Sequence, residues 1–273
     1  MEIQVLGPLE ARVNGRSILP TAAKPRQVLA LLALHAGAVV PVSTIVDELW
    51  GENPPRSAQT TLQTYVMQLR RLLDAALAPN GRSAKDVLTT RFGGYMLDVD
   101  PECVDATEFA RLAEAGRRAF DYGDHDAAAR LLDEAQRLCR GATLVDVAVG
   151  LPLGMEITRL EETRLAALEN RIEAELSLGR HQSLLGELSM LCARYPMNEN
   201  LRAQQMLALY RSGRQWQALE VFGSLRATLV DELGVEPSAR LQALQHRILD
   251  SDPALELRPA HLEPGLQIAS SAS

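Results

Sequence analysis

A short glycine motif recurs in the second half of this 273-residue sequence, and it limits the possible folds more than any other feature. Gly179-Arg180 returns as Gly213-Arg214 after 34 residues, and each pair separates two amphipathic helical segments. Pro196 lies between the copies, where it closes the intervening helix pair. A fixed period of this length, built of helix, turn and helix, is typical of stacked repeats. The pattern therefore predicts an array of helix pairs.

An earlier stretch fits the same arrangement. Two helical segments flank Gly123-Asp124 and look like a further copy, offset by a long helix at 156–178. We therefore predict an all-α domain of tetratricopeptide-like repeats over residues 104–250. Residues 252–273 are rich in Pro, Ala and Ser, and we expect them to form a disordered tail.

Residues 1–99 follow a different pattern, in which β-type runs enclose three helical segments. Alternating apolar residues surround an Asn14-Gly15 turn, which indicates a hairpin. A second hairpin is predicted where Gly93-Gly94 separates two β-type runs. The helical segments lie between the hairpins, at 24–35, 43–50 and 57–78. A helix, a turn, a longer helix and a hairpin together predict a winged helix-turn-helix. The expected fold class is thus mainly α with small antiparallel β-sheets.

Charge is distributed unevenly along the chain. The net charge is −7, yet residues 1–98 carry ten Lys or Arg against eight Asp or Glu, whereas residues 99–273 carry 18 against 27. No acidic residue lies between Glu52 and Asp74, a window that contains most of the longest helical segment of the first domain. Such a helix can dock on phosphates without repulsion from its own carboxylates. The composition therefore permits double-stranded DNA as a partner.

The helical segment 57–78 has two distinct faces when projected at 100° per residue. One face is an apolar stripe that suits a core. The opposite face carries hydroxyl, amide and guanidinium groups that can bond base edges and phosphates, and methyl-bearing surface for thymine. We predict that this polar face reads DNA; its residues are Thr60, Gln63, Thr64, Met67 and Arg71, with Arg56 leading in on the same side.

Three other basic residues are candidate DNA contacts. Arg91 lies at the turn of the second hairpin, where a wing can enter the minor groove. Lys24 and Arg26 lie in the first turn of their helix and could contact phosphate. A solvated helix start explains the last two residues equally well.

Four motifs together resemble the Streptomyces antibiotic regulatory protein family. They are KPRQVL at 24–29, VDELWG at 46–51, LQTYVMQLRRLL at 62–73 and GGY at 93–95. The resemblance extends from Met1 to about Asp250. It implies a winged helix-turn-helix of the response-regulator output type over 1–99 and a bacterial transcriptional activation domain over 104–250.

The resemblance also implies a function and assigns residues to it. It implies a pathway-specific activator of antibiotic biosynthesis genes that binds tandem direct repeats at promoters as a homodimer and recruits RNA polymerase holoenzyme. It matches Arg70, Arg71 and residues 60–64 to the recognition helix, and Arg91 to the wing arginine. Phe92 departs from the pattern, because a glycine usually follows that arginine. The sequence contains no G-x-x-x-x-G-K-[ST] motif, so we expect no ATP-driven control.

Other classes of function find less support. The sequence contains no G-x-S-x-G and no C-x-x-C motif, so we predict no catalytic site, metal or cofactor. The three cysteines, at 103, 139 and 192, are expected to be buried thiols. No apolar run could span a bilayer and no signal peptide pattern follows Met1, which predicts a cytoplasmic protein. A repeat-based adaptor that binds only proteins and a DNA-binding repressor remain alternatives, because activation follows from the resemblance alone.

Overall fold

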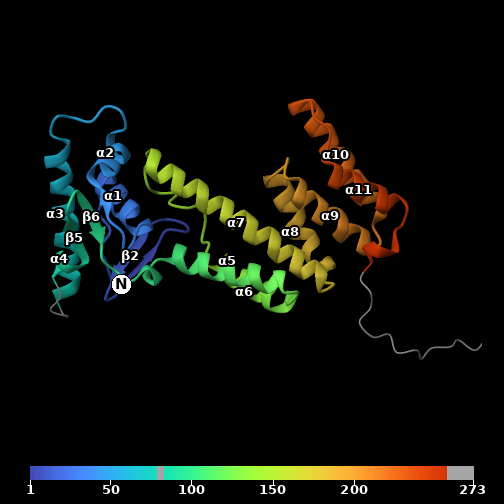
Figure 1. Ribbon diagram of the computed structural model, residues 1–273, viewed down its shortest axis with the longest axis horizontal. Helices are drawn as coiled ribbons and strands as arrows, with labels where there is room; N and C mark the ends of the chain where they lie inside the picture. The colour runs from blue at the N-terminus through green and yellow to red at the C-terminus, as the bar shows by residue number, and fades with distance from the viewer. Residues whose placement is uncertain (79–82, 257–273) are drawn as a thin grey trace, which may run out of the picture. The chain divides into compact units, whose positions relative to one another are not determined.

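The computed structural model describes residues 1–78 and 83–256, and this part of the chain is mostly helical with two small antiparallel sheets, as predicted (Figure 1). The chain divides into two compact units, Met1–Arg171 and Ile172–Ser273. The first unit thus contains the winged helix-turn-helix and also the first helical pair. Residues 257–273 of the predicted tail lie outside the described residues, whereas Pro253–Leu255 form a short 3-10 helix, η3.

The first sheet has the strand order β1-β2-β3 and opens the chain. Its strands are β1 (Glu2–Gln4), β2 (Glu10–Val13) and β3 (Arg16–Ser17). Asn14 and Gly15 join β2 to β3 with φ angles of 50° and 77°, so the predicted hairpin turn is confirmed. The apolar positions of the segment are buried, as alternation requires.

Three helices follow at the predicted places: α1 (Ala23–Leu34), α2 (Val42–Trp50) and α3 (Ala58–Leu77). The apolar stripe of α3 faces the core, because Leu62, Val66, Leu69 and Leu73 are each at most 2% exposed. The buried stripe leaves the opposite face of α3 to solvent.

The wing is a hairpin of β5 (Leu88–Arg91) and β6 (Gly94–Leu97), preceded by the short helix α4 (Ala84–Val87). Strand β6 lies between β5 and β4 (Val40–Pro41) in an antiparallel sheet. A Cβ atom on Gly94 would lie 2.3 Å from the carbonyl oxygen of Val40, so only glycine allows this close approach.

The first helical pair consists of α5 (Asp105–Asp121) and α6 (His125–Arg137), after a 3-10 helix, η2 (Pro101–Cys103). The long helix α7 (Leu151–Ser177) comes next. The second unit continues with α8 (His181–Arg194), α9 (Glu199–Arg211), α10 (Gln215–Leu233) and α11 (Ala239–Leu249).

The predicted glycine turns share one geometry. Gly123, Gly179 and Gly213 have φ angles of 79°, 80° and 73°, a conformation that strains other residues. In each turn the glycine N–H bonds a carbonyl three residues back, and the next N–H bonds a carbonyl five residues back. These bonds satisfy carbonyls at the end of each preceding helix. The helix-turn-helix pattern of the sequence is therefore present in the fold.

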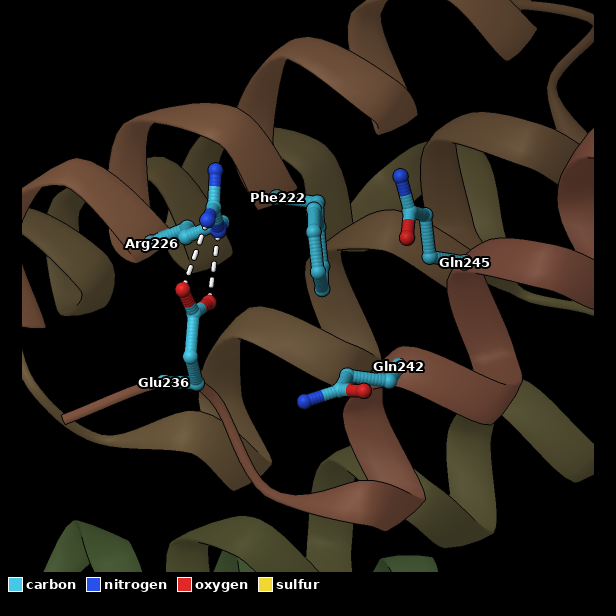
Figure 2. Close-up of a pocket in the computed structure, with 5 residues that line it drawn as sticks. All are labelled: Phe222, Arg226, Glu236, Gln242 and Gln245. Carbon is cyan, nitrogen blue, oxygen red and sulfur yellow. Dashed lines mark hydrogen bonds and ion pairs between the residues drawn. The ribbon is translucent and has the colours of Figure 1, made fainter.

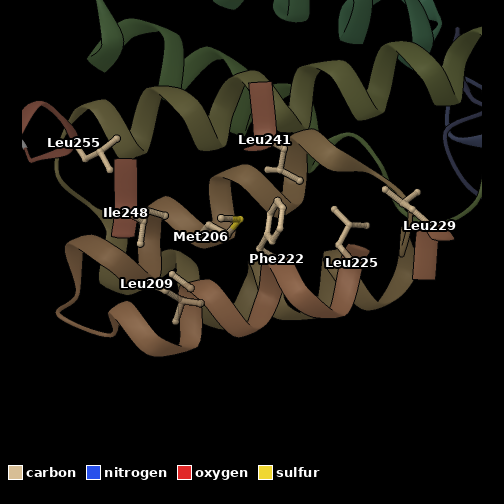
Figure 3. Packing of buried hydrophobic residues seen from close by; sticks show 9 residues of the cluster. Met206, Leu209, Phe222, Leu225, Leu229, Leu241, Ile248 and Leu255 are labelled. Carbon is tan, nitrogen blue, oxygen red and sulfur yellow. The ribbon is translucent and has the colours of Figure 1, made fainter. Parts of the chain in front are cut away.

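The core of the second unit lies among α9, α10, α11 and η3 (Figure 3). Its centre is formed by Met206, Phe222, Leu225, Leu241 and Ile248, which are between 0% and 6% exposed. Among the cysteines, only Cys192 is fully buried, and its burial raises the pKa of the thiol to about 11. The prediction of buried thiols is wrong in degree for the other two, which are half-buried.

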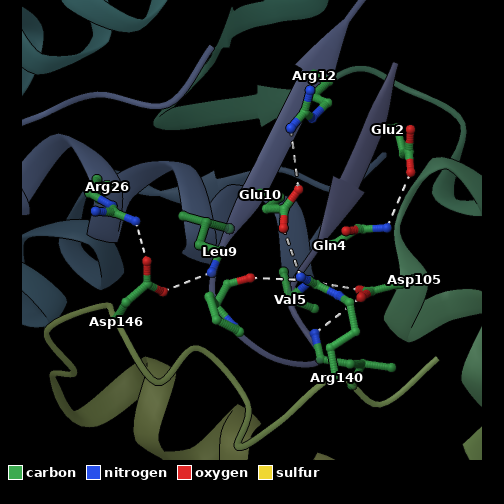
Figure 4. A network of polar contacts seen from close by, with 12 residues as sticks. Glu2, Gln4, Val5, Leu9, Glu10, Arg12, Arg26, Asp105, Arg140 and Asp146 are labelled. Carbon is green, nitrogen blue, oxygen red and sulfur yellow. Dashed lines mark hydrogen bonds and ion pairs between the residues drawn. The ribbon is translucent and has the colours of Figure 1, made fainter. Parts of the chain in front are cut away.

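Polar contacts join the region of the first sheet to the start of α5 and to the segment between α6 and α7 (Figure 4). The Asp105 carboxylate accepts hydrogen bonds from the N–H groups of Val5 (2.7 Å) and Leu6 (3.1 Å). Burial raises the pKa of this carboxyl above its ordinary value, although the two hydrogen bonds oppose the shift. Asp146 accepts a hydrogen bond from the N–H of Leu9 at 2.7 Å and forms an ion pair with Arg26.

The most deeply buried of these polar contacts is made by a carboxylate of α2. Glu48 of α2 is only 3% exposed. It accepts hydrogen bonds from the N–H groups of Gly150 (2.6 Å) and Leu153 (2.9 Å) and from the side-chain amide of Gln27 (3.0 Å). The first two donors lie at the start of α7, where helix N–H groups lack partners within the helix. Glu48 therefore caps α7 from within the winged helix-turn-helix.

We expect Glu48→Ala to lower the free energy of unfolding by roughly 2–4 kcal/mol, because three donors, two of them buried, lose their acceptor. Urea denaturation followed by circular dichroism measures the change. Glu52→Ala is the control, since Glu52 is exposed in the turn after α2 and its loss should cost at most a few tenths of a kcal/mol. Equal stability of the two variants would contradict the capping role.

Candidate nucleic-acid interface

The outer face of α3 is exposed along its length. The structure places the side chains of the predicted reading residues in solvent, and Met67 is 54% exposed. The exposed set comprises Thr60, Gln63, Thr64, Met67 and Arg71, with Arg56 exposed ahead of the helix. Gln59 and Gln68 are also exposed on this helix, and the prediction did not include them. The helical period already contained this signal, since they lie four residues before Gln63 and four after Thr64.

Thr64 has a defined hydroxyl orientation. Its Oγ1 donates a hydrogen bond to the carbonyl of Thr60, one turn earlier, at 3.1 Å. With its proton committed to the helix backbone, the hydroxyl can only accept a bond from a base, and the γ-methyl group stays free for apolar contact. Thr64 is thus suited to a thymine methyl or to the amino group of adenine or cytosine.

Arg70 differs from the other predicted reading residues because its guanidinium is bonded to the wing. Its Nε and one terminal nitrogen donate to the carbonyl of Leu88, at 3.0 and 2.7 Å. The same terminal nitrogen lies 2.9 Å from the hydroxyl of Thr90. The side chain therefore joins α3 to β5, and we expect it to fix the wing relative to the recognition helix.

The wing presents two different side chains at its turn. Arg91 is exposed, but its guanidinium lies 3.4 Å from the carboxylate of Asp98, which follows β6. Phe92 and Gly93 form the turn itself, and the ring of Phe92 is fully exposed. Arg91 is thus held along the side of the hairpin, and the aromatic residue occupies its tip.

Lys24 and Arg26 bond to other parts of the first unit. The Lys24 ammonium donates to the carbonyl of Leu49 at 2.6 Å and lies 4.7 Å from the centre of the Trp50 ring. Arg26 pairs with Asp146. The Trp50 ring in turn stacks on Tyr65 of α3, with centroids 6.4 Å apart. The contacts of Lys24 thus join α1 to α2, and the ion pair of Arg26 joins α1 to the segment between α6 and α7.

The second unit contains a hollow between α10 and α11, with a volume of about 360 Å³ (Figure 2). Phe222 forms one wall, and Gln242 and Gln245 line the side of α11. Its two charged groups neutralise each other, because Arg226 donates two hydrogen bonds of 2.6 Å to Glu236. The hollow therefore offers no unpaired charge to a ligand.

Within residues 1–78 and 83–256, no helix combines the length and hydropathy needed to cross a bilayer. In the same part of the chain, no cluster of three or more His, Cys, Asp or Glu side chains is arranged to hold a metal ion.

Comparisons with protein families match both domains described above. Residues 104–249 match the family model of the bacterial transcriptional activator domain, and residues 16–97 match that of the transcriptional regulatory protein, C terminal. The first match covers all four helices α8 to α11 and the three that precede them. The second covers the three helices, the wing and β3.

Individual relatives match over nearly the whole chain. Regulatory protein DnrI of Streptomyces peucetius is 59% identical over 94% of each chain. Transcriptional regulator RedD of Streptomyces coelicolor is 37% identical over 95% of this chain and 73% of its own. A solved structure of Mycobacterium tuberculosis EmbR, in complex with a low affinity phosphopeptide, has a TM-score of 0.86 and 33% identity, covering 92% of this chain and 65% of that one.

The neighbouring arginines of α3 should respond differently to truncation. Arg70→Ala should lower the free energy of unfolding by about 1–3 kcal/mol, because the wing loses charged hydrogen bonds to Leu88 and Thr90. Arg71→Ala should leave stability within about 0.5 kcal/mol, since Arg71 is exposed. It should instead lower the slope of log K against log salt by about one unit.

Thermal denaturation and DNA-binding titrations at several salt concentrations measure both effects. If Arg70→Ala left stability unchanged and reduced the salt dependence as Arg71→Ala does, Arg70 would be a phosphate contact and not the support of the wing.

Proposed function

Because the chain belongs to the Streptomyces antibiotic regulatory protein family of DNA-binding transcriptional activators, we propose that it switches on genes of one antibiotic or related biosynthetic pathway. It does so from the cytoplasm, by binding promoter DNA through α3 and the wing. One observation carries the reading site: between Ala58 and Leu73 the exposed face of α3 bears Thr, Gln, Met and Arg side chains and no carboxylate, and Arg70 bonds this helix to the hairpin.

The chemistry of this face suits the major groove. Glutamine amides can pair with adenine, the Thr64 methyl group can pack on thymine, and Arg71 can bond phosphate or guanine. The wing adds Arg91 beside the duplex, where the negative potential of phosphates or of a narrow minor groove attracts a guanidinium. Its ion pair with Asp98 is exposed and therefore weak enough to be exchanged for phosphate.

The family resemblance extends the proposal to partners. Two copies bind tandem direct repeats as a homodimer, and RNA polymerase holoenzyme is recruited beside them. Two relatives that match 94% and 95% of this chain are by name a regulatory protein and a transcriptional regulator, which supports a regulatory role without catalysis.

The decisive experiment is a footprint on promoters adjacent to the gene, followed by titrations with Thr64→Ala. The variant should weaken binding to the preferred site by about 1–3 kcal/mol and relax the preference at one base position. Thr228→Ala is a matched control, because Thr228 on α10 makes the same hydroxyl-to-backbone bond at 3.1 Å and belongs to the second unit. Unchanged preference at every base would show that this face does not read the site.

The tandem arrangement has a separate test. Two copies that read the same side of the duplex must sit about one helical turn, roughly 10–11 bp, apart. Inserting about 5 bp between half-sites should abolish cooperative binding, whereas inserting about 10 bp should restore part of it. Cooperativity that is indifferent to spacing in a mobility-shift titration would exclude direct contact between adjacent copies.

A further inference from the structure

The tip of the wing carries an aromatic ring that the described part of the chain leaves uncovered. Phe92 has a relative exposure of 107%, whereas Phe109 and Phe222 are 0% and 6% exposed. A ring held in water gains none of the free energy that burial provides. Single exposed apolar residues are common, so the significance of Phe92 depends on where the backbone holds it.

The backbone of the hairpin is fixed at both ends. Gly93 has a φ angle of 76°, and its carbonyl accepts a hydrogen bond from the N–H of Val42 at 2.9 Å. Gly94 lies directly against the carbonyl of Val40. On the other strand, Arg70 bonds the carbonyl of Leu88. The turn is therefore bonded to the start of α2, while Arg70 of α3 bonds the opposite end of the hairpin, so the paired strands hold the ring at the tip of the wing.

The neighbouring arginine does not occupy the same place. The guanidinium of Arg91 is drawn towards Asp98, which lies at the opposite end of the hairpin from the turn. This orientation leaves an apolar group, and not a charge, as the foremost part of the wing. An apolar tip can pack against an uncharged part of DNA, such as the sugars that lie next to the phosphates.

We propose that Phe92 enters the minor groove beside the base pairs read by α3 and packs its ring against deoxyribose. The walls of this groove are lined by sugar C–H groups, and apolar side chains are used by other proteins to occupy or wedge it open. The contact rests on the proposed function, since it needs α3 in the neighbouring major groove. It would make the wing a source of affinity that does not depend on salt.

Hydroxyl-radical footprinting on a single half-site tests the contact, because these radicals attack deoxyribose hydrogens that face the minor groove. The wild-type protein should protect a short stretch of sugars flanking the region covered by α3. Phe92→Ala should lose this protection and bind about 3- to 30-fold more weakly. Phe92→Trp or Phe92→Leu should retain part of both, since each keeps an apolar group at the tip.

Salt titrations separate this contact from a charge contact. Phe92→Ala should leave the slope of log K against log salt unchanged, while Arg91→Ala lowers it by about one unit. Tyr122→Ala is the control for loss of an exposed aromatic ring, because Tyr122 is 88% exposed at the end of α5, and it should bind like the wild type. All three variants should keep the wild-type circular dichroism and melting temperature, since the side chains are exposed.

Two results would overturn the proposal. One is wild-type affinity and sugar protection in Phe92→Ala. The other is a loss confined to cooperative binding at two half-sites, which would place the ring against a second copy of the chain. If the wild-type protein protected no promoter sequence at all, the proposed function itself would fail, and that outcome is distinct from both.

Discussion

The hydrogen bonds of one buried carboxylate join the start of α7 to α1 and α2 of the winged helix-turn-helix. Glu48 can be buried because the N–H groups of Gly150 and Leu153 and the side-chain amide of Gln27 donate hydrogen bonds to it. A buried charge without such partners would be costly, so the start of α7 and the end of α2 have to form together. Asp105 and Asp146 have a similar role beside the first sheet, where Asp105 accepts two backbone N–H groups and Asp146 accepts one. Asp105 and Asp146 thus accept hydrogen bonds from the DNA-binding domain. In return, Glu48 of that domain accepts hydrogen bonds from the start of α7.

Features set by local periodicity were predictable from the sequence. The face of α3 follows from the 3.6-residue period, and the turns at Gly123, Gly179 and Gly213 follow from the need for a positive φ angle at the end of a helix. The Asn14-Gly15 hairpin follows from turn chemistry alone. In each case the residues that determine the structure lie within about five positions of one another.

The roles of several basic residues were not predictable, because their partners are distant in the sequence. Arg70 bonds Leu88, Arg26 pairs with Asp146, and Lys24 lies over Trp50. Each pairing depends on tertiary packing that no local pattern encodes. An arginine next to a reading face looks like a DNA contact in the sequence, and only its hydrogen bonds reveal that it also supports the wing. The role of Glu48 was not predictable for the same reason, since two of its three donors lie 102 and 105 residues away.

Because these basic side chains bond to groups of the protein itself, they affect how the protein distributes between its target site and non-specific chromosomal DNA. Arg26 is paired with Asp146, and Lys24 and Arg70 donate hydrogen bonds to backbone carbonyls, so these three cations are less available than an exposed one such as Arg71 to displace counterions from arbitrary DNA. A genome presents millions of competing sites, and a weaker hold on each leaves more molecules free to diffuse. A small number of molecules per cell can then occupy a promoter, because base contacts determine that occupancy more than the total positive charge of the protein does.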